Sequence, residues 1–253
     1  MSAARFAFVL ASAALLGLAP GFVGQAAAQD HGNPDMFWRA GAYLWWANID
    51  GENHIGDAEL TVGDSTKLYA SFAGDVQVGK GAFRGVLTFS TTSLSNTTEI
   101  EGPGIPDGTL AAYDFSQTMA ELFAWWQIGT FSTDHAFQLF GGLRYTHQSQ
   151  KILTSSVVGN YGETWVEPVA GAQYFVEMGS VFWATVTGNM GGVLFGSEFS
   201  WGVGAEFGAH VYGPLHLGLA YRYFQTEYEN SDTGYRWDVG ETQGWYMGVI
   251  IKG

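Results

Sequence analysis

Apolar and polar residues alternate with a period of two along most of the chain, and residues 215–224 show the pattern most clearly. One face of this segment carries Leu215, Leu217, Leu219, Tyr221 and Tyr223, and the other carries His216, Gly218, Ala220, Arg222 and Phe224. A period of two is that of a β-strand, whose successive side chains point to opposite faces. The apolar face of such a strand packs on a soluble core or against lipid, so one strand leaves both environments open.

Nine further segments repeat this alternation. The ten segments are 37–48, 71–79, 82–93, 113–128, 136–150, 164–176, 181–190, 199–211, 215–228 and 235–251. Each is near or above the ~9–11 residues that a tilted strand needs to cross a membrane. Short connections rich in Gly and small polar residues alternate with longer polar ones, which places both ends of the series on the side of the short turns.

This order predicts an all-β fold, a closed antiparallel up-and-down transmembrane β-barrel of about ten strands. Eight or twelve strands stay open as alternatives, because residues 59–62 can form an additional short strand and segment 113–128 is long.

The two faces of the segments indicate which side meets lipid. In segment 199–211 the apolar face begins Phe199, Trp201, Val203, whereas the opposite face is small or polar and includes Glu206. A soluble barrel needs its bulky apolar side chains inside. We therefore expect the leucines of 215–224 to face lipid and Arg222 to face the lumen. We also expect aromatic girdles at the two membrane boundaries, formed by Trp38, Trp45, Trp46, Trp125, Trp126, Trp183, Tyr221, Tyr223, Trp237 and Trp245.

The N-terminus and the composition agree with an exported barrel. Residues 1–28 combine one early Arg, an apolar run over 6–18 and a small-residue site at 26–28, as a secretory signal peptide does. The barrel domain is then expected over residues 29–253. There are 36 glycines and no cysteine, and aromatic residues reach 16%, so a small disulfide-stapled domain is excluded. The net charge of −14 disfavours nucleic acid as a partner.

Four short motifs carry a resemblance to a known family. They are Gly142-Leu143-Arg144-Tyr145, Trp165-Val166-Glu167-Pro168, Gly196-Ser197-Glu198-Phe199-Ser200-Trp201 and Tyr221-Arg222-Tyr223, in that order. With this succession the chain resembles a poorly characterised family of small Gram-negative outer-membrane β-barrel proteins. The resemblance implies an outer-membrane location, with membrane lipid, lipopolysaccharide and the barrel-assembly machinery as partners. Barrels of this class usually end on an aromatic residue, whereas this sequence ends Ile250-Ile251-Lys252-Gly253, so the register of the last strand stays open.

Charges of both signs fall on the faces expected to line the lumen. By alternation these are Arg39, Asp75, Arg84, Glu121, Arg144, Glu167, Glu206, Arg222, Arg236 and Asp238. A charge in a narrow lumen must be paired or hydrated, so we interpret the set as a network of guanidinium–carboxylate bonds that fills the barrel. A charge-selective constriction in a continuous pore is the alternative.

Catalytic groups are less evident. His147 and Ser149 share an outward face, which resembles the His-x-Ser pair of lipid A deacylases, but no carboxylate is placed to orient the histidine. His54 beside Glu52 is weaker still. We expect no enzyme activity, no cofactor and no defined metal site. The acidic outside loops can attract divalent cations; they contain Asp50, Glu52, Asp57, Glu59, Asp64, Glu99, Glu101, Asp107, Glu227, Glu229 and Asp232.

The expected function is that of a non-enzymatic outer-membrane barrel with a structural or narrow-pore role. A porin-like channel for small solutes is the main alternative, and a membrane-embedded hydrolase acting on lipid or peptide is a weaker one.

Overall fold

The computed structural model describes residues 36–55, 58–62, 69–101, 105–106, 108–132, 134–153, 158–192 and 194–253. The expected signal peptide, 1–28, lies outside these residues. The strands are β1 (Met36–Ile55), β2 (Ala58–Val62), β3 (Tyr69–Lys80), β4 (Phe83–Glu101), β5 (Leu110–Ser132), β6 (His135–Leu153), β7 (Val158–Met178), β8 (Phe182–Gly191), β9 (Phe199–Tyr212), β10 (Leu215–Asn230) and β11 (Tyr235–Lys252). The described residues contain no helix that is long and apolar enough to span a membrane.

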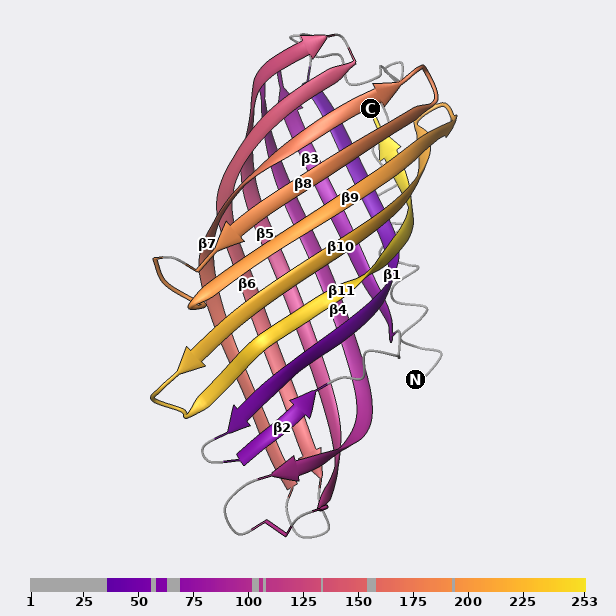
Figure 1. Ribbon diagram of the computed structural model, residues 1–253. Helices are drawn as coiled ribbons and strands as arrows, with labels where there is room; N and C mark the ends of the chain where they lie inside the picture. Colours follow the sequence, from indigo (N-terminus) through magenta and orange to yellow (C-terminus); the bar gives the residue numbers. More distant parts are fainter. Residues whose placement is uncertain are drawn as a thin grey trace.

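Antiparallel pairing closes the strands into a ring (Figure 1). From β3 to β11 each strand pairs with the next, and β1 pairs with both β11 and β3. Ten strands thus form the ring in the described residues, as predicted. The short strand anticipated at 59–62 is β2, which pairs with the far end of β1 and with β4 at Glu59 and Leu60. It takes the place of β3 where that strand has already ended. The fold is a closed up-and-down β-barrel.

Short turns and long connections lie at opposite ends of the ring, as the sequence pattern predicts. Gly81, Gly179 and Gly213 sit in three of the short turns with φ of 59°, 70° and 53°, a backbone region that favours glycine. The first residues of β1 and the last of β11 lie at this end, since Arg39 is opposite Lys252. We call it the inner end, and the end with the long connections the outer end.

The inner part of the barrel has apolar residues outside and polar residues inside. On β10 the outward side chains Leu217 and Leu219 are 51% and 45% exposed, whereas Arg222 points inward. On β4 the outward positions include Phe83, Leu87 and Phe89, while Arg84 and Thr88 bond inside. Apolar side chains exposed all round a closed ring, with ions inside, give the polarity of a membrane barrel. We call this outer surface the apolar belt.

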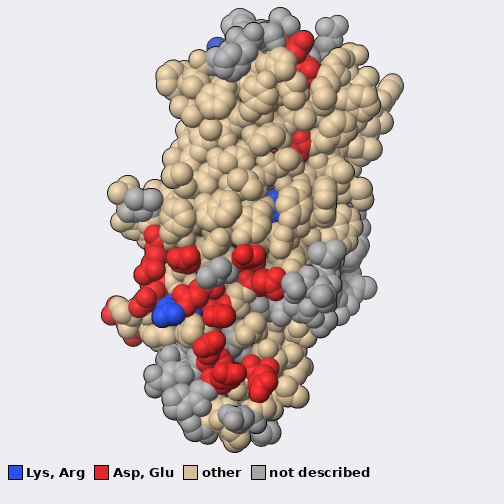
Figure 2. Space-filling model, viewed as in Figure 1, with Lys and Arg blue, Asp and Glu red and all other residues tan. Residues whose placement is uncertain are grey.

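Toward the outer end the polarity reverses. The outward positions of β4 become Ser95, Thr97 and Glu99, while Leu94 and Ile100 point inward and are buried. Inside lies an apolar layer, formed by Ile49, Leu94, Ile100, Ala111, Tyr113, Phe115, Ile152, Trp165, Tyr228, Tyr235 and Trp237. Figure 2 shows carboxylates gathered on the surface of this part of the barrel. The outer part is therefore built like a soluble barrel, with its core inside.

This reversal explains why the strands are longer than predicted. β7 begins at Val158 rather than at 164, and β5 begins at Leu110 rather than at 113. The alternation of hydrophobicity fades where neither face meets lipid, although the backbone pairing continues. β5 with 23 residues is about twice the ~9–11 residues that a membrane crossing needs, so the barrel projects well beyond the apolar belt.

The wall of the projecting part is completed by side chains where β8 and β9 are short. Residues 158–168 of β7 lie beyond the end of β8, which pairs only from Val169 onward. The ring of Trp165 stacks on Tyr228 of β10 with centroids 4.2 Å apart. Glu163 accepts hydrogen bonds from Asn230 and Thr233 at 3.2 and 2.6 Å. These contacts join β7 to β10 across the gap.

The expected aromatic girdles are only partly correct. Trp38, Trp126 and Trp245 are exposed on the barrel surface. Four of the tryptophans assigned to the girdles are instead buried inside the barrel, namely Trp45, Trp125, Trp183 and Trp237. All four occupy inward positions of their strands. Glycines on neighbouring strands leave room for three of the rings, with Gly244 against Trp45, Gly208 against Trp183 and Gly51 against Trp237, whereas Trp125 stacks on Phe140. The interior is thus more apolar than the sequence suggested.

Candidate functional site

The lumen contains a row of three directly opposed charges from neighbouring strands. Glu121 of β5 lies opposite Arg144 of β6, which lies opposite Glu167 of β7. Arg144 Nε donates to Glu121 Oε1 at 2.7 Å, and Nη1 donates to Glu167 Oε1 at 2.9 Å. Arg144 and Glu167 are fully buried. The row arises because antiparallel register places inward residues side by side.

Residues on other strands complete the coordination of this row. Arg144 also donates to Asn189 Oδ1 on β8 and to Ser200 Oγ on β9, at 2.9 and 3.2 Å. Glu167 Oε2 accepts from Ser197 and Ser200. Because Ser197 belongs to the connection between β8 and β9, this loop is held against the lumen wall. Gly196 permits the close approach with φ of 91°, since a Cβ there would clash with the carbonyl of Val166.

Arg222 bonds to the same row from the opposite side of the barrel. Its Nη2 donates to Glu121 Oε1 at 3.0 Å and its Nη1 to Oε2 at 3.4 Å. Thr88 of β4 donates to Glu121 Oε2 at 2.8 Å. Glu121 therefore receives two guanidinium groups and one hydroxyl. The ring of Phe224 lies beneath both cations, 4.4 Å from Arg144 Cζ and 5.6 Å from Arg222 Cζ.

A second cluster lies closer to the inner end, around Arg39. Arg39 Nη2 donates to Tyr43 OH at 2.7 Å and to Glu206 Oε1 at 2.8 Å, and its Nε lies 3.4 Å from Asp75 Oδ2. Tyr43 OH in turn donates to Asp75 Oδ1 at 2.9 Å. The cluster joins β1, β3 and β9 across the lumen. The Arg39 guanidinium is thus shared by the carboxylates of Asp75 and Glu206, and the Tyr43 hydroxyl accepts from Arg39 and donates to Asp75.

Arg84 lies in the lumen but bonds to amides rather than to the carboxylates expected. It donates to Gln77 and Gln173 at 3.2 and 2.9 Å and also to Gln138. Its guanidinium lies 4.4 Å from the centre of the Trp125 ring. These glutamines occupy inward positions of β3, β6 and β7. Neutral amide oxygens accept from a cation without adding charge, so sequence reasoning that searched for charge pairs did not find them.

Two of the ten predicted lumen residues point outward instead. β11 carries one extra residue between Trp237 and Gly240 relative to β10, since Thr226 is opposite Gly240 but Tyr228 is opposite Trp237. This β-bulge reverses the alternation, so Trp237 turns inward and Arg236 and Asp238 turn outward. Arg236 Nε donates to Asp238 Oδ2 at 2.6 Å, which raises the pKa of Arg236 above its ordinary value. Strict alternation from the end of the strand could not reveal the bulge.

The remaining eight residues form a charge-balanced set. Arg39, Arg84, Arg144 and Arg222 face Asp75, Glu121, Glu167 and Glu206 within one lumen. Formal neutrality reduces the electrostatic cost of holding ions away from bulk water. The missed partners, which include Tyr43, Asn189 and Ser200, share the inward parity of their strands. That parity is the one sequence signal that could have identified them.

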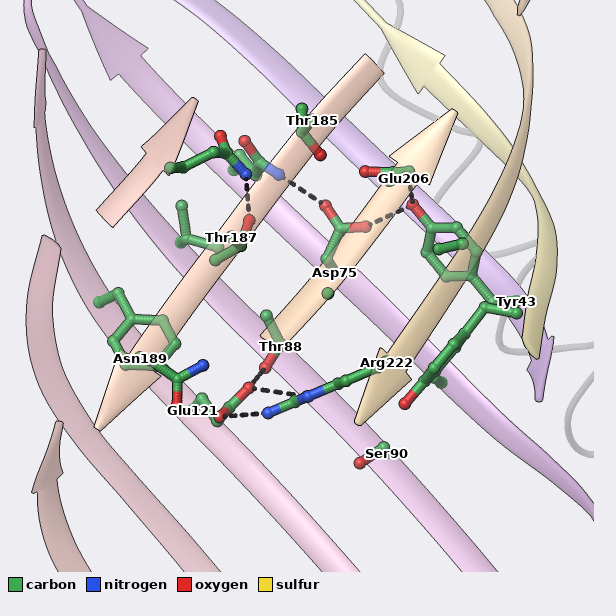
Figure 3. Close-up of a pocket in the computed structure, with 18 of the residues that line it drawn as sticks. Tyr43, Asp75, Thr88, Ser90, Glu121, Thr185, Thr187, Asn189, Glu206 and Arg222 are labelled. Carbon is green, nitrogen blue, oxygen red and sulfur yellow. Dashed lines mark hydrogen bonds and ion pairs between the residues drawn. The ribbon is translucent and has the colours of Figure 1, made fainter. Parts of the chain in front are cut away.

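A cavity of about 230 Å³ separates the two clusters. Figure 3 shows Thr88, Glu121 and Arg222 on one side of it, and Tyr43, Asp75 and Glu206 on the other. The hydroxyls of Ser90, Thr185 and Thr187 also line the cavity. A space of this size with hydroxyl, carboxylate and guanidinium groups around it can hold several water molecules or one small polar solute.

The candidate catalytic pair is not assembled as a hydrolase would need. The Nδ1 atom of His147 lies 2.8 Å from Thr164 Oγ1 on β7, across the strand pair. His54 lies 3.3 Å from Asp238 Oδ2 on the outer surface rather than with Glu52. No carboxylate is seen to orient His147 among the described residues.

The acidic connections do not gather into a metal site in the described part of the chain, where no group of three His, Asp or Glu side chains could hold a metal ion. Asp57, Asp64 and Asp107 of those connections lie outside the described residues.

Comparison with known proteins gives a likeness of fold only. No family model matches the chain, and no curated protein matches it. Among solved structures, Ail of Yersinia pestis is 12% identical with a TM-score of 0.38, over 85% of this chain and 98% of that one. The translocator domain of the autotransporter NalP from Neisseria meningitidis is 13% identical with a TM-score of 0.44, over 98% and 95%. Neisserial surface protein A is 12% identical with a TM-score of 0.34, over 85% and 96%. Scores this low carry no functional argument.

Proposed function

We propose that this chain is an integral outer-membrane β-barrel protein with a structural, non-enzymatic role in the cell envelope. The observation that carries the proposal is the belt of exposed apolar side chains around a closed ring, which ends at one level and gives way to a polar surface with an apolar interior. A soluble barrel does not expose an apolar belt, and a barrel fully embedded in the membrane does not have a polar outer surface around an apolar interior. Membrane lipid and the barrel-assembly machinery are the partners that such a protein requires.

The lumen supports a structural role rather than a wide pore. Two ionic clusters cross it, and an apolar layer fills the barrel beyond them. A ring of ten strands encloses little more than its own side chains. The network joins strands far apart in the sequence, such as β5 and β10 through Glu121 and Arg222. It therefore ties opposite walls of the barrel together.

The test is the behaviour of the folded protein in detergent and in membranes. A barrel of this kind is expected to run at different positions on a gel when unheated and when boiled, because the ring resists denaturation by detergent at room temperature. It is also expected to fractionate with outer membranes. A mature protein that is monomeric and soluble without detergent would overturn the proposal.

A narrow channel for small solutes is the second candidate, favoured by the hydroxyl-lined cavity between the two clusters. In planar bilayers a structural barrel is expected to give no resolved current steps. Replacing Trp165 and Tyr228 with Ala opens the apolar layer on the outer side of the cavity. A channel function requires steady wild-type currents, which this double variant would enlarge.

A further inference from the structure

The outer surface of the adjacent strands β9, β10, β11 and β1 carries a band of aromatic, amide and carboxylate side chains, next to the apolar belt on the side of the outer end. Its first row places Tyr221 of β10 opposite Trp245 of β11, which lies opposite Trp46 of β1. One step outward, Tyr223 lies opposite Gln243, which lies opposite the buried Asn48. A further step outward brings Trp201 of β9, Gln225, Glu241 and Asp50 into one row. From the first row to the third, amides and then carboxylates join the aromatic rings on this surface.

Contacts within this band hold its side chains in fixed positions. Tyr221 packs edge-on against Trp245 with ring centroids 5.2 Å apart, and Trp201 lies 5.1 Å from Tyr223. Tyr221 OH donates to Gln243 Oε1 at 2.6 Å, and Trp201 Nε1 donates to Gln225 Oε1 at 3.0 Å. Each amide oxygen already accepts a hydrogen bond within the band, and each amide nitrogen is a donor that a ligand hydroxyl can accept from.

The chemistry of the band matches a sugar better than a phosphate. The apolar face of a pyranose ring packs on an aromatic ring, and its hydroxyls bond to amide nitrogens and carboxylate oxygens. None of the residues named in the three rows is a Lys or Arg. Arg236, farther toward the outer end of β11, is paired with Asp238. A phosphate group alone would meet Glu241 and Asp50 and be repelled.

The position of the band next to the apolar belt indicates that its ligand is a lipid. It continues directly from the exposed apolar residues of the same strands, Leu217, Leu219, Met247 and Val249. A molecule with acyl chains against these residues carries its headgroup at the level of the band. Outer-membrane barrels have short periplasmic turns and longer loops on the outside, so a band near the end with the long connections lies at the level of the outer leaflet.

We propose that the band formed by Trp46, Trp201, Tyr221, Tyr223, Gln225, Gln243 and Trp245 binds the sugar headgroup of an outer-leaflet glycolipid. The proposal rests on the proposed outer-membrane function. The acyl chains lie along the apolar belt, and one sugar ring packs on Trp245 and Tyr221. Phosphate substituents on the sugar are tolerated only with Mg²⁺ bound between them and the carboxylate row.

The experiment compares lipid binding by two matched tryptophan variants. Trp245 and Trp126 are 50% and 52% exposed on β11 and β5, but Trp126 lies toward the inner end, where it stacks on Phe83 at 6.2 Å. Trp245→Leu, Trp126→Leu and Gln243→Ala would be purified in an amine-oxide detergent, which carries no sugar. Binding of rough lipopolysaccharide with Mg²⁺, and of phosphatidylethanolamine, would be measured by native mass spectrometry.

Trp245→Leu and Gln243→Ala are expected to weaken lipopolysaccharide binding roughly three- to tenfold, the loss of one aromatic contact or one hydrogen bond. Trp126→Leu and the wild type should bind alike, and phosphatidylethanolamine should bind equally to all four proteins. Equal losses of lipopolysaccharide binding in Trp245→Leu and Trp126→Leu would mean that the band acts only as an interfacial aromatic girdle, and would overturn the proposal. Undiminished binding by Trp245→Leu would overturn it as well. Heat-modifiable gel mobility of each variant reports separately whether the barrel itself has formed.

Discussion

Arg144→Leu tests whether the lumen network holds the barrel together. Arg144 is fully buried and, among the described residues, is the one cation bonded to Glu167, which is also fully buried. After the substitution, Glu167 keeps only the hydroxyls of Ser197 and Ser200. Glu121, by contrast, keeps Arg222 and Thr88. The variant therefore leaves one buried carboxylate without a counter-charge.

The magnitude follows from that difference. Leaving a fully buried ion unpaired costs about 3–5 kcal/mol. Arg222→Leu should cost less, about 1–2 kcal/mol, because Arg144 still neutralises Glu121 and because the Arg222 side chain is 24% exposed to the cavity. With an m-value of about 2 kcal/mol per M of urea, Arg144→Leu lowers the unfolding midpoint by roughly 1.5–2.5 M.

Urea unfolding of the protein folded into lipid vesicles, followed by tryptophan fluorescence, measures these midpoints. Arg236→Leu is the matched control, since its guanidinium pairs with Asp238 on the outer surface, and its midpoint should equal that of the wild type. Adding Glu167→Gln to Arg144→Leu removes the unpaired charge and should recover part of the loss. The network does not stabilise the barrel in this way if Arg144→Leu has the same urea midpoint as Arg236→Leu, or if adding Glu167→Gln lowers the midpoint further.

Three further variants test other parts of the fold by the same midpoint. Leu217→Arg on the apolar belt should cost about 2–4 kcal/mol near mid-bilayer depth, whereas Thr97→Arg, on the polar outer surface of β4 beyond the belt, should be tolerated; similar costs for the two variants would mean that the belt does not end where we place it. Trp237→Ala should cost about 3–5 kcal/mol, because this buried ring stacks on Phe115 at 5.4 Å; a wild-type midpoint would mean that the outer part has no apolar core. Gly196→Ala, at φ of 91° against the Val166 carbonyl, should cost about 1–3 kcal/mol, and Gly179→Ala, whose Cβ meets open space, less; the reverse order would count against docking of the β8–β9 connection on β7.

Local pattern was sufficient for the architecture. The period of two, the alternation of short and long connections and the number of segments all depend on neighbouring residues, and they predicted ten strands closed into a ring. The same parity placed eight charged residues in the lumen, Arg39, Asp75, Arg84, Glu121, Arg144, Glu167, Glu206 and Arg222. Within a regular strand, one correctly placed residue fixes the face of every other.

The pattern was insufficient where that regularity ends. One extra residue near Trp237 reverses the faces of β11, so Arg236 and Asp238 leave the lumen. Hydrophobicity likewise could not separate an outward-facing tryptophan such as Trp245 from a lumen-filling one such as Trp183, because both rings avoid water. The environments differ only once the ring is closed and the level of the apolar belt is known.

The sequence by itself determined the number and order of the strands and the inward position of eight ions, since these follow from the chemistry of residues close together in the chain. Only the tertiary structure decided which ions meet. Glu121 and Arg222 are 101 residues apart and bond because their strands face each other across the lumen. Arg84 meets three amides because Gln77, Gln138 and Gln173 converge on it from three strands. Partners across a barrel depend on how far each strand is shifted against its neighbours around the ring, and that cumulative stagger is a property of the closed sheet.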